Sequence, residues 1–510
     1  MKWKKLRFFI AVAAITAFSS QTYGQGYVDD ALRISQPVLR GSTRTQSLGA
    51  AFSSLGGDIG VLSSNPAGLG FYRKSDISFT PEYSNSSLQS SYFYNKVNDS
   101  KQGWNVGNFG IVFAHSSPEA DRGLATDNRL ISFAFGAGYS RNSSFNRNTT
   151  FSGHNPGRSF NSLLSDQANA SGITGQDYGS TLGGIAFDEY LINPTNKAMT
   201  TFAPVQAANL DQNGSMQENG YSDESNFSFG TNFGNVVYVG AGVNFDNLSY
   251  QRLTQFNETG IVDPAMKIDG ITYSKFTSQY GTGINGKAGI IFNLANALHI
   301  GGYVQSPTNY SMYETSDMSL YGLKTNQLIG PSVSNTDNMG KVTAGTYDPT
   351  VSATNSYHIR TPYKYTAGAS LILGKFMLLT GEADYLDYRQ MRFSSDNSSV
   401  DMNINSQIQT KYKAVINYKA GAELKFGPLV IRGGYVFASS PLSNSVTDAD
   451  RRILTGGFGI RSGNFYIDFG GVRDFSRSYR NLYTLNDNTG PSLKQYNIRT
   501  SGTVTIGTRF

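Results

Sequence analysis

The sequence predicts an all-β protein, a 14-stranded antiparallel transmembrane β-barrel plugged by an N-terminal hatch. Three observations support this prediction. The chain begins with a secretory leader, segments of alternating apolar and polar residues continue to its end, and short turns alternate with long polar loops between these segments. We therefore divide the chain into a signal peptide over residues 1–24, a hatch over 25–74 and a barrel over 75–510.

The leader combines a basic start with a short apolar stretch. Its basic residues are Lys2, Lys4, Lys5 and Arg7. The apolar run from Phe8 to Phe18 is shorter than the roughly 20 residues that a helix needs to cross a bilayer, so we expect cleavage and not a permanent anchor. Thr22 and Gly24 fit the −3 and −1 positions of a cleavage site, which makes Gln25 the first mature residue.

Composition excludes several classes of protein. Four of the 42 basic residues belong to the leader, so 38 basic residues face 36 acidic ones in the rest of the chain. This near-neutral balance argues against a nucleic-acid partner. The absence of cysteine excludes a lipid-anchored N-terminus, a disulfide framework and a thiolate site. A mean hydropathy of −0.32 is compatible with a membrane barrel, because alternation hides its apolar residues.

Alternation with a period of two marks the strands. In the segment 236–250, one face carries Val237, Val239, Ala241, Val243 and Phe245, and the other carries mainly polar residues and glycine. The same pattern recurs in 376–388, 414–426 and 464–479, as expected for a lipid-facing side and a polar lumen side. The predicted strands are 76–88, 105–114, 130–145, 222–233, 236–256, 272–292, 298–316, 356–373, 376–393, 410–426, 429–440, 452–461, 464–480 and 494–510.

The connections support a membrane barrel over a soluble β-sandwich, whose strands average about 5–6 residues. Two-residue turns occur at Gly234–Asn235, Gly374–Lys375, Gly427–Pro428 and Ser462–Gly463. The long loops are 89–104, 146–221, 257–270, 317–355, 394–409, 441–451 and 481–493, of which 146–221 is the largest. This alternation predicts the outer membrane of a Gram-negative bacterium, with both termini in the periplasm. The terminal Phe510 fits recognition by the barrel insertion machinery.

The hatch is rich in small residues and has no strand-like alternation. Its glycines, Gly41, Gly49, Gly56, Gly57, Gly68 and Gly70, permit close backbone approach. Asn65–Pro66 favours a turn, and residues 29–33 (DDALR) favour a short helix with acidic residues near its start. We expect this compact segment to lie inside the barrel.

The hatch and several later segments resemble the FadL/TodX family of outer-membrane transporters for hydrophobic compounds. The similar hatch residues run from Gly41 through Gly49-Ala50-Ala51-Phe52 and Gly57-Asp58 to Asn65-Pro66-Ala67-Gly68-Leu69. Residues 303–313 (YVQSPTNYSMY), 360–363 (RTPY) and 432–435 (RGGY) are similar to strand motifs of the same family. The resemblance covers most of the mature chain, and fourteen is the strand number of that family.

The resemblance implies a gated path for hydrophobic molecules. A substrate would bind in a groove of the extracellular loops, enter an apolar lumen pocket and leave sideways through a gap at the third strand after the hatch rearranges. The hatch or gate residues carried over are Asn65, Pro66, Ala67 and Gly68, and the third-strand kink candidates are Gly136 and Gly138. From the residues alone, the first set fits a fixed cap equally well, and the two glycines fit mere room for a packed hatch.

The loop 146–221 has an apolar content that is unusual for an extracellular loop. Residues 159–170 and 180–193 favour two short helices. The apolar groove candidates are Leu163, Leu164, Leu182, Ile185, Phe187, Tyr190 and Leu191. Exposed apolar residues would mark an interaction site, whereas the alternative is that they pack on a small core of the loop itself.

Nothing in the sequence predicts an enzyme. The four histidines, His115, His154, His299 and His358, fall at separate places in the expected topology, so no catalytic residue is assigned. No metal-ligand spacing and no phosphate-binding loop is present, and we expect no metal and no cofactor.

Three functions remain open from the sequence. The first is an outer-membrane channel for passive, gated uptake of hydrophobic compounds, with long-chain fatty acids, aromatic hydrocarbons and haem as candidate substrates. The second is a hydrophilic diffusion porin, and the third is a structural or adhesive barrel that binds a partner through its loops. The long N-terminal segment favours the first. The expected partners are outer-membrane lipid and a hydrophobic small molecule, and the resemblance implies a monomer.

Overall fold

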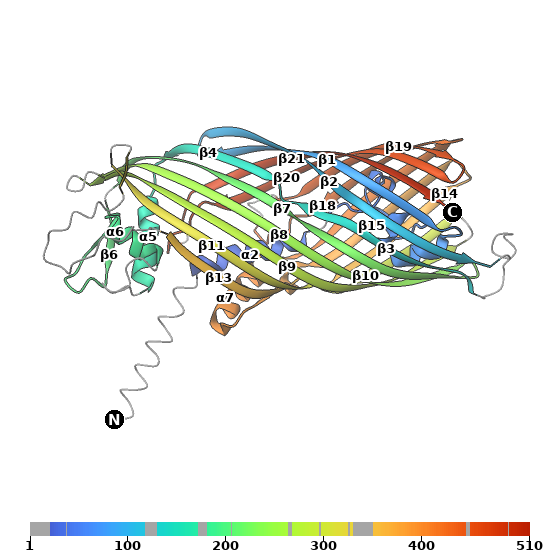
Figure 1. The fold of residues 1–510 in the computed structure, drawn as a ribbon, viewed down its shortest axis with the longest axis horizontal. Helices are drawn as coiled ribbons and strands as arrows, with labels where there is room; N and C mark the ends of the chain where they lie inside the picture. The colour runs from blue at the N-terminus through green and yellow to red at the C-terminus, as the bar shows by residue number, and fades with distance from the viewer. Residues whose placement is uncertain are drawn as a thin grey trace, which may run out of the picture.

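The computed structural model is a long β-barrel with helices inside it and at one end (Figure 1). It describes residues 21–36, 38–117, 130–171, 181–205, 207–263, 268–294, 297–324, 327–329, 350–444, 449–487 and 489–510. Its helices are α2 (Gln21–Ser35), α3 (Thr43–Ser47), η1 (Ile59–Leu62), η2 (Pro66–Phe71), α5 (Phe160–Ser171), α6 (Leu182–Asp188), η3 (Tyr388–Gln390) and α7 (Ser398–Lys411). The predicted leader lies largely outside the described residues, and α2 contains the predicted cleavage position.

The barrel is closed and has fourteen antiparallel wall strands, which confirms the predicted fold class. Some wall strands consist of two segments in series, such as β10 and β11. The wall segments are β1 (Asp76–Tyr92), β2 (Asn95–Ser116), β3 (Leu130–Ser144), β4 (Arg147–Asn155), β7 (Ala207–Phe233), β8 (Val237–Asp263), β9 (Ile268–Leu294), β10 (Leu298–Gln305), β11 (Asn309–Lys324), β12 (Gln327–Ile329), β13 (Thr350–Arg360), β14 (Lys364–Leu373), β15 (Met377–Asp387), β16 (Arg392–Ser394), β17 (Ala414–Phe426), β18 (Leu429–Ala438), β19 (Arg451–Ser462), β20 (Phe465–Asn481) and β21 (Ser492–Arg509). The seam joins β1 to β21, from Asp76–Arg509 to Tyr92–Leu493.

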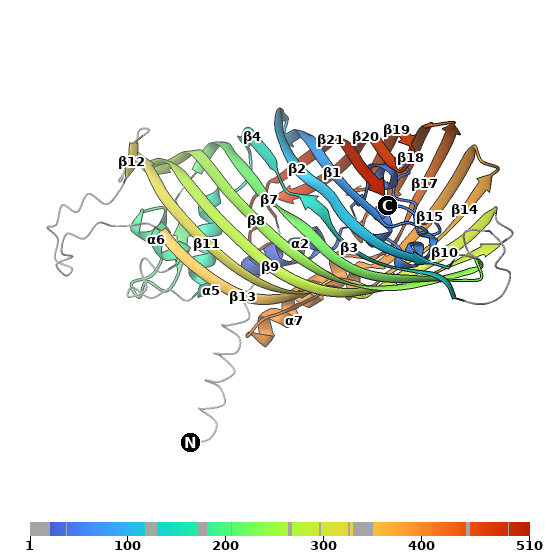
Figure 2. The same ribbon diagram turned by 45° about the vertical axis from the view of Figure 1, so that its right-hand side comes forward.

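The predicted short turns connect the strands at one end of the barrel (Figure 2), with two residues at 427–428 and 463–464 and three at 234–236 and 374–376. Gly234 and Asn235 both have positive φ values, 62° and 57°. Two such residues in sequence form the turn whose twist matches a β-hairpin, so this turn links β7 to β8.

Apolar side chains point outward near this short-turn end. In β8, Val243 and Phe245 are exposed, whereas the alternating Asn244 and Asp246 are buried in the lumen. Other neighbouring strands expose Phe227, Phe229, Ile290, Phe292, Phe458 and Ile460 in the same way. This pattern matches the lipid-facing surface predicted from the alternation.

The strands are longer at the other end than the sequence predicted. Residues 89–104, expected as a loop, belong almost entirely to β1 and β2, which remain paired up to Tyr92 and Asn95. In the same way, β4 and the first half of β7 lie within the expected loop 146–221. These extensions are rich in Ser, Asn and Gln, and backbone hydrogen bonds hold them together. Only scattered apolar side chains, such as Tyr92, Phe151 and Met216, are buried on their inner side, so the alternation that marked the other strands is weak here.

Helix α7 contradicts a second prediction from the sequence, which expected a loop at 394–409. Asn397 caps its first turn through the N–H groups of Ser399 and Val400, and the buried Ile404 and Ile408 lie one turn apart on its inner face. β15 ends at Asp387, and beyond it β16, which pairs with β13, and α7 complete the wall towards the long-loop end.

A small cap stands at the long-loop end (Figure 2). It contains α5, α6 and the short pair β5 (Ile192–Pro194) and β6 (Phe202–Pro204). Among the described residues, no helix is long and apolar enough to cross a membrane.

Candidate functional site

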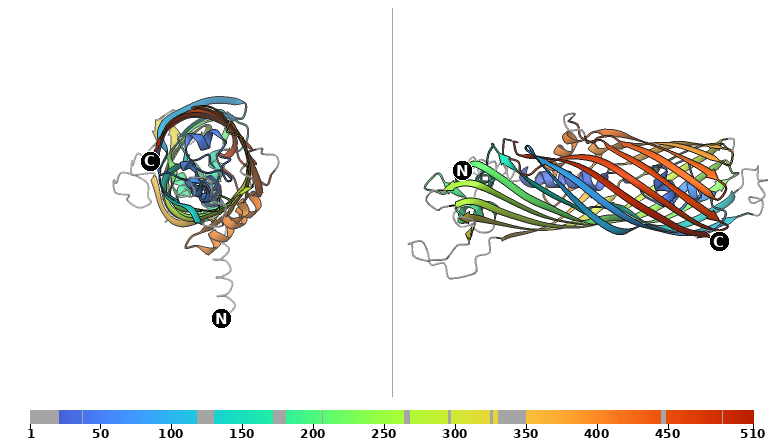
Figure 3. Two further views of the ribbon diagram at one scale, coloured as in Figure 1. Left: turned by 90° about the vertical axis from the view of Figure 1, so that its right-hand side faces the viewer. Right: turned by 90° about the horizontal axis from the view of Figure 1, so that it is seen from above.

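The segment 38–74 lies inside the barrel, where it forms three short helical turns. Figure 3, viewed along the barrel, shows this segment within the ring of strands. Each turn begins with a side chain that accepts a backbone N–H: Ser42 from Thr45, Asp58 from Gly60, and Asn65 from Ala67. Such N-caps satisfy donors that a short helix leaves unpaired. This segment is the part of the predicted hatch, residues 25–74, that follows α2, and the name hatch is kept for it alone.

Asn65 joins the hatch to the wall. Its side-chain oxygen accepts the N–H of Ala67 at 3.0 Å, and its Nδ2 donates to the carbonyl oxygen of Ser53 at 2.7 Å. The same Nδ2 lies 3.3 Å from the carbonyl oxygen of Ile290 and 3.2 Å from that of Gly302. The predicted gate residues Pro66, Ala67 and Gly68 follow in η2 and are buried.

Glycines on the inner wall allow the hatch backbone to come close. A Cβ atom at any of them would meet a hatch residue, and the spacing would be too tight at nearly all. The glycines are Gly110, Gly136, Gly138, Gly230, Gly240, Gly289, Gly301, Gly368, Gly421, Gly434, Gly457 and Gly470. They come from β2, β3, β7, β8, β9, β10, β14, β17, β18, β19 and β20. The hatch is therefore packed against a ring of glycines around most of the barrel.

Buried charges tie the hatch to further wall strands, β15, β17 and β18. Arg44 donates to Glu423 at 2.9 Å, and Glu423 also accepts from Arg432 at 2.7 Å. Glu382 accepts the N–H groups of Phe52 and Ser53 at 3.0 and 2.8 Å. Because an unpaired buried charge is costly, these contacts hold the hatch in one position.

The third wall strand meets the hatch at the predicted glycines. Gly136 and Gly138 both face Leu62 of η1. The β2–β3 ladder is regular at both positions and ends at Asn108–Ser140, and the register of β3 against β7 shifts between Arg141 and Ser143. The irregularity thus lies a few residues beyond the glycines that the sequence singled out.

Side chains bridge the wall beyond the end of this ladder. Asp99 of β2 accepts from the N–H of Thr150 at 2.7 Å, and Lys101 donates to Asn219 at 2.5 Å. At the end of the ladder itself, the hydroxyl of hatch residue Ser63 lies 2.5 Å from that of Ser140. The hatch is therefore in contact with the place where the backbone ladder between β2 and β3 stops.

The resemblance implied an apolar pocket in the lumen, and the described residues form a lumen cavity whose lining is mixed. Between α2 and the hatch lies a cavity of about 90 Å³. Its lining mixes apolar residues such as Val38 and Leu386 with the cations Arg40, Lys364 and Lys419. Each cation is paired with a wall acid, Arg40 with Glu224 and both lysines with Asp384.

Helix α2 fills the lumen above this cavity. Its Arg33 donates to Gln279 at 2.6 Å and lies over the ring of Tyr250 at 3.5 Å. Its Val28 is buried and accepts from the hydroxyl of Tyr412 at 3.0 Å. The helix expected around residues 29–33 is thus present, and it extends back to Gln21.

The groove expected on the largest loop is not an exposed surface. The predicted helices are present as α5 and α6, but Leu163, Leu164, Leu182, Ile185 and Leu191 are buried in one core and Phe187 packs against it. Of the seven candidates, Tyr190 is the exposed one, at 48%. The alternative, a small core of the loop itself, describes this arrangement, and wall residues such as Tyr92 and Phe256 complete that core.

The histidines do not converge. His115 lies in β2, His154 in β4, His299 in β10 and His358 in β13. The part of the chain that the structure describes contains no group of three or more His, Cys, Asp or Glu side chains arranged to hold a metal ion.

Sequence reasoning missed two features of the site. Ser63 and Ser140 carry no motif, so their contact could not be foreseen. The glycines of the inner wall can be found in the sequence at alternate strand positions. Their shared role, contact with the hatch, follows only from the pairing of the strands.

Solved structures share this fold over most of the chain. The crystal structure of a Pseudomonas aeruginosa FadL homologue matches with a TM-score of 0.57 and 12% identity, covering 93% of this chain and 99% of that chain. That of the Pseudomonas putida toluene transporter TodX matches with a TM-score of 0.52 and 12% identity, covering 93% and 99%. No protein-family model and no curated protein matches the sequence. The fold is therefore that of the FadL-type outer-membrane barrels.

Proposed function

We propose that this chain, which shares its fold with FadL- and TodX-type transporters, is an outer-membrane channel for the passive, gated uptake of hydrophobic compounds. The hatch is the gate, and a compound leaves sideways through the wall between β2 and β3. Long-chain fatty acids and aromatic hydrocarbons are the first substrate classes to test.

The blocked lumen argues against an open diffusion porin. The hatch contacts wall strands around most of the barrel, and the cavity between it and α2 is small, at about 90 Å³. A sugar or a fatty acid would need a rearrangement of the hatch to pass.

The single observation that carries the proposal is the contact between Ser63 and Ser140. It joins the hatch to the last residue of β3 that pairs with β2. A movement of η1 would break this contact, and beyond it side-chain bonds of Asp99 and Lys101 join β2 to β4 and β7. Hatch movement and a sideways opening are thereby coupled at one point.

A reversible disulfide tests this coupling, because the chain has no cysteine of its own. In the variant Ser63→Cys/Ser140→Cys, the short side-chain separation suits a disulfide. Uptake of a labelled long-chain fatty acid, toluene and a small sugar is then measured in proteoliposomes, oxidised and after reduction. We expect oxidation to abolish hydrophobic uptake and reduction to restore it, with no sugar entry in either state.

The matched control is Ser84→Cys/Ser501→Cys. These two buried serines are directly opposite each other in β1 and β21, so their disulfide joins wall to wall and leaves the hatch free. Hydrophobic uptake that continues in the oxidised Ser63–Ser140 variant contradicts the proposal. Sugar entry into the native protein supports the porin instead, and entry of no probe supports a barrel that binds a partner through its loops.

A further inference from the structure

A groove lies on the outer face of the wall formed by β9, β10, β14 and β15. Small residues occupy facing positions on three neighbouring strands, where Gly302 of β10 is opposite Ala367 of β14, which is opposite Ala383 of β15. Ile290 borders this row on one side. The groove has a volume of about 670 Å³ and is lined by Ala288, Gly289, Ile290, Gly302, Tyr303, Val304, Tyr365, Thr366, Ala367, Ala383, Tyr385 and Ile416.

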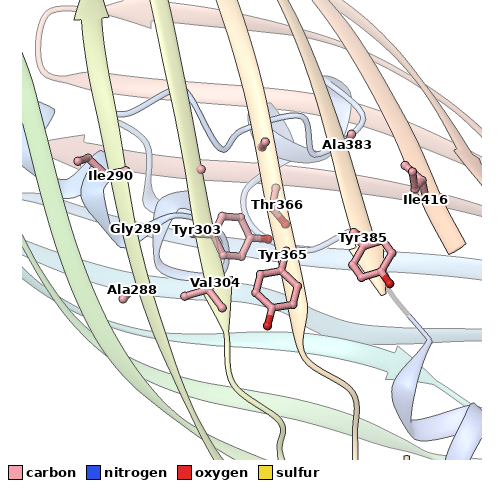
Figure 4. Close-up of a pocket in the computed structure, with 12 residues that line it drawn as sticks. Ala288, Gly289, Ile290, Tyr303, Val304, Tyr365, Thr366, Ala383, Tyr385 and Ile416 are labelled. Atoms are coloured by element: carbon pink, nitrogen blue, oxygen red, sulfur yellow. The ribbon is translucent and has the colours of Figure 1, made fainter. Parts of the chain in front are cut away.

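Larger side chains border the groove on the side of the long loops. Figure 4 shows Val304, Tyr365, Tyr385 and Ile416 on four neighbouring strands. All four are exposed on the outer surface, at 36–48%. The groove therefore lies in the lipid-facing surface, where an acyl chain is the surrounding medium.

Two arginines stand above the groove. Arg360 and Arg392 are directly opposite each other in β13 and β16, and both are exposed on the outer face. Like charges in this arrangement repel each other. Among the described residues, neither forms an ion pair with an acid, and Arg392 donates to the carbonyl oxygens of Arg389 and Met391 at 2.8 Å. The nearby Arg389, by contrast, is neutralised by Asp387 at 2.8 and 2.9 Å.

A row of tyrosines connects the arginines to the groove. The guanidinium of Arg360 lies 5.9 Å from the ring of Tyr363, whose ring lies 6.1 Å from that of Tyr365. Tyr365 in turn lies 6.4 Å from Tyr385. Tyrosines gather at the boundary between water and lipid, so this row marks the level of the headgroups. Arg360 and Ala367 are separated along the chain by at most about 23 Å, at roughly 3.3 Å per residue, with residues 361–363 connecting β13 to β14.

We propose that Arg360, Arg392 and the groove form a binding site for a phosphorylated membrane lipid. The phosphate contacts both guanidinium groups and relieves their mutual repulsion, since arginine donates two parallel hydrogen bonds to phosphate. The acyl chain runs down the row of small residues. The groove lies on the other side of the wall from the hatch, whose Asn65 bonds the carbonyl oxygens of Ile290 and Gly302 from the lumen.

The test is lipid retention by the full chain in detergent micelles, followed by native mass spectrometry. Phosphatidic acid and phosphatidylcholine with identical chains are added in equal amounts. We expect the native protein to retain phosphatidic acid preferentially, and Arg360→Gln/Arg392→Gln to lower that preference at least tenfold. Equal retention of phosphatidic acid by this variant and the native protein overturns the proposal.

Two further variants separate the site from general effects. Arg452→Gln/Arg473→Gln removes two exposed arginines of β19 and β20 and is expected to keep the preference, so an equal loss there means unspecific attraction and overturns the site. Ala367→Phe/Ala383→Phe fills the groove without touching the arginines and is expected to lower retention of phosphatidic acid. Unchanged retention overturns the role of the groove, and displacement of the lipid by inorganic phosphate alone overturns the role of the chain. Heat-dependent migration in gels verifies that every variant is folded.

Discussion

The side-chain oxygen of Asn65 occupies the space that a Cβ atom would take at Gly289. Gly289 belongs to β9 and Asn65 to the hatch, so a side chain on the wall and a side chain on the hatch compete for one position. The missing side chain at residue 289 is what allows Asn65 to reach the carbonyl oxygens of Ile290 and Gly302.

We therefore expect Gly289→Ala to displace the hatch turn. The added methyl group forces a shift of backbone or side chain, which costs typically 1–3 kcal/mol in a packed interior. We expect the free energy of unfolding in urea to fall and the leakage of a small sugar to rise. Gly286→Ala is the control on the same strand, because the nearest atom to its Cβ is 3.8 Å away. Equal behaviour of the two variants would show that the space at 289 does not matter.

Replacing Asn65 itself removes both its cap and its contacts with the wall. Asn65→Ala should lower the free energy of unfolding by about 2–4 kcal/mol, with about 1 kcal/mol from the cap and about 1 from each good buried hydrogen bond. Asn397→Ala removes the cap of α7 alone and should cost only about 1 kcal/mol. A smaller loss for Asn65→Ala than for this control would contradict the bridging role.

The ion pairs between hatch and wall give a third prediction. Glu423→Gln leaves Arg44 and Arg432 buried without their shared acid, and loss of one partner of a buried pair costs about 3–5 kcal/mol. Hydrogen exchange at residues 43–47 should accelerate before the wall strands open. Asp387→Asn breaks a pair whose arginine is 53% exposed and should cost less than about 1 kcal/mol. Unchanged exchange in the Gln variant would mean that other contacts hold the hatch.

The cap at the long-loop end should respond to pH through Glu189. This side chain is buried and accepts the N–H of Gly322 in β11 at 2.9 Å. Burial, with Asp188 nearby, raises the pKa of Glu189 to about 7. A raised pKa in the folded state means that the docked cap binds the proton more tightly than the undocked one.

Protonated Glu189 therefore stabilises the docked cap fully below pH ~4.5, the ordinary range of a glutamate pKa. This stabilisation of the cap is lost as the pH rises through about 7. After correction for intrinsic rates, hydrogen exchange in α6 should be slower at pH 5 than at pH 8. Burial also raises the pKa of the neighbouring Asp188 to about 6. Glu189→Gln should therefore reduce this difference and Asp188→Asn/Glu189→Gln should remove it, whereas the exposed Asp487→Asn should retain it. A pH difference that survives in the double variant would assign it to another group.

The sequence supports the wall more firmly than the interior. Gly234–Asn235 and the other short turns carry their own backbone signal, and the alternation from Val237 to Phe245 records which side faces lipid. Both follow from local rules, and both agree with the structure. The helix α7 does not follow from them, because its buried Ile404 and Ile408 contact the lumen helix α2, which is distant in sequence.

The polar character of the lumen cavity was hidden for a similar reason. Lys364, Lys419 and Asp384 alternate with lipid-facing residues, so their inward direction was readable. Which of them meet depends on the pairing of β14, β15 and β17. The apolar residues of the largest loop likewise looked like a surface, because the wall side chains that cover them lie elsewhere in the chain.

The seam of the barrel has a consequence for the order of assembly. The N–H of Thr43 in the hatch donates to the hydroxyl of Thr505 in β21 at 2.8 Å, and Thr505 meets Thr80 of β1 at 2.7 Å. The first and last strands of the wall thus close over a segment that precedes them both. The bond between hatch and Thr505 therefore depends on the same strand that closes the cylinder. A chain that stops before β21 lacks both the seam and this anchor of the hatch.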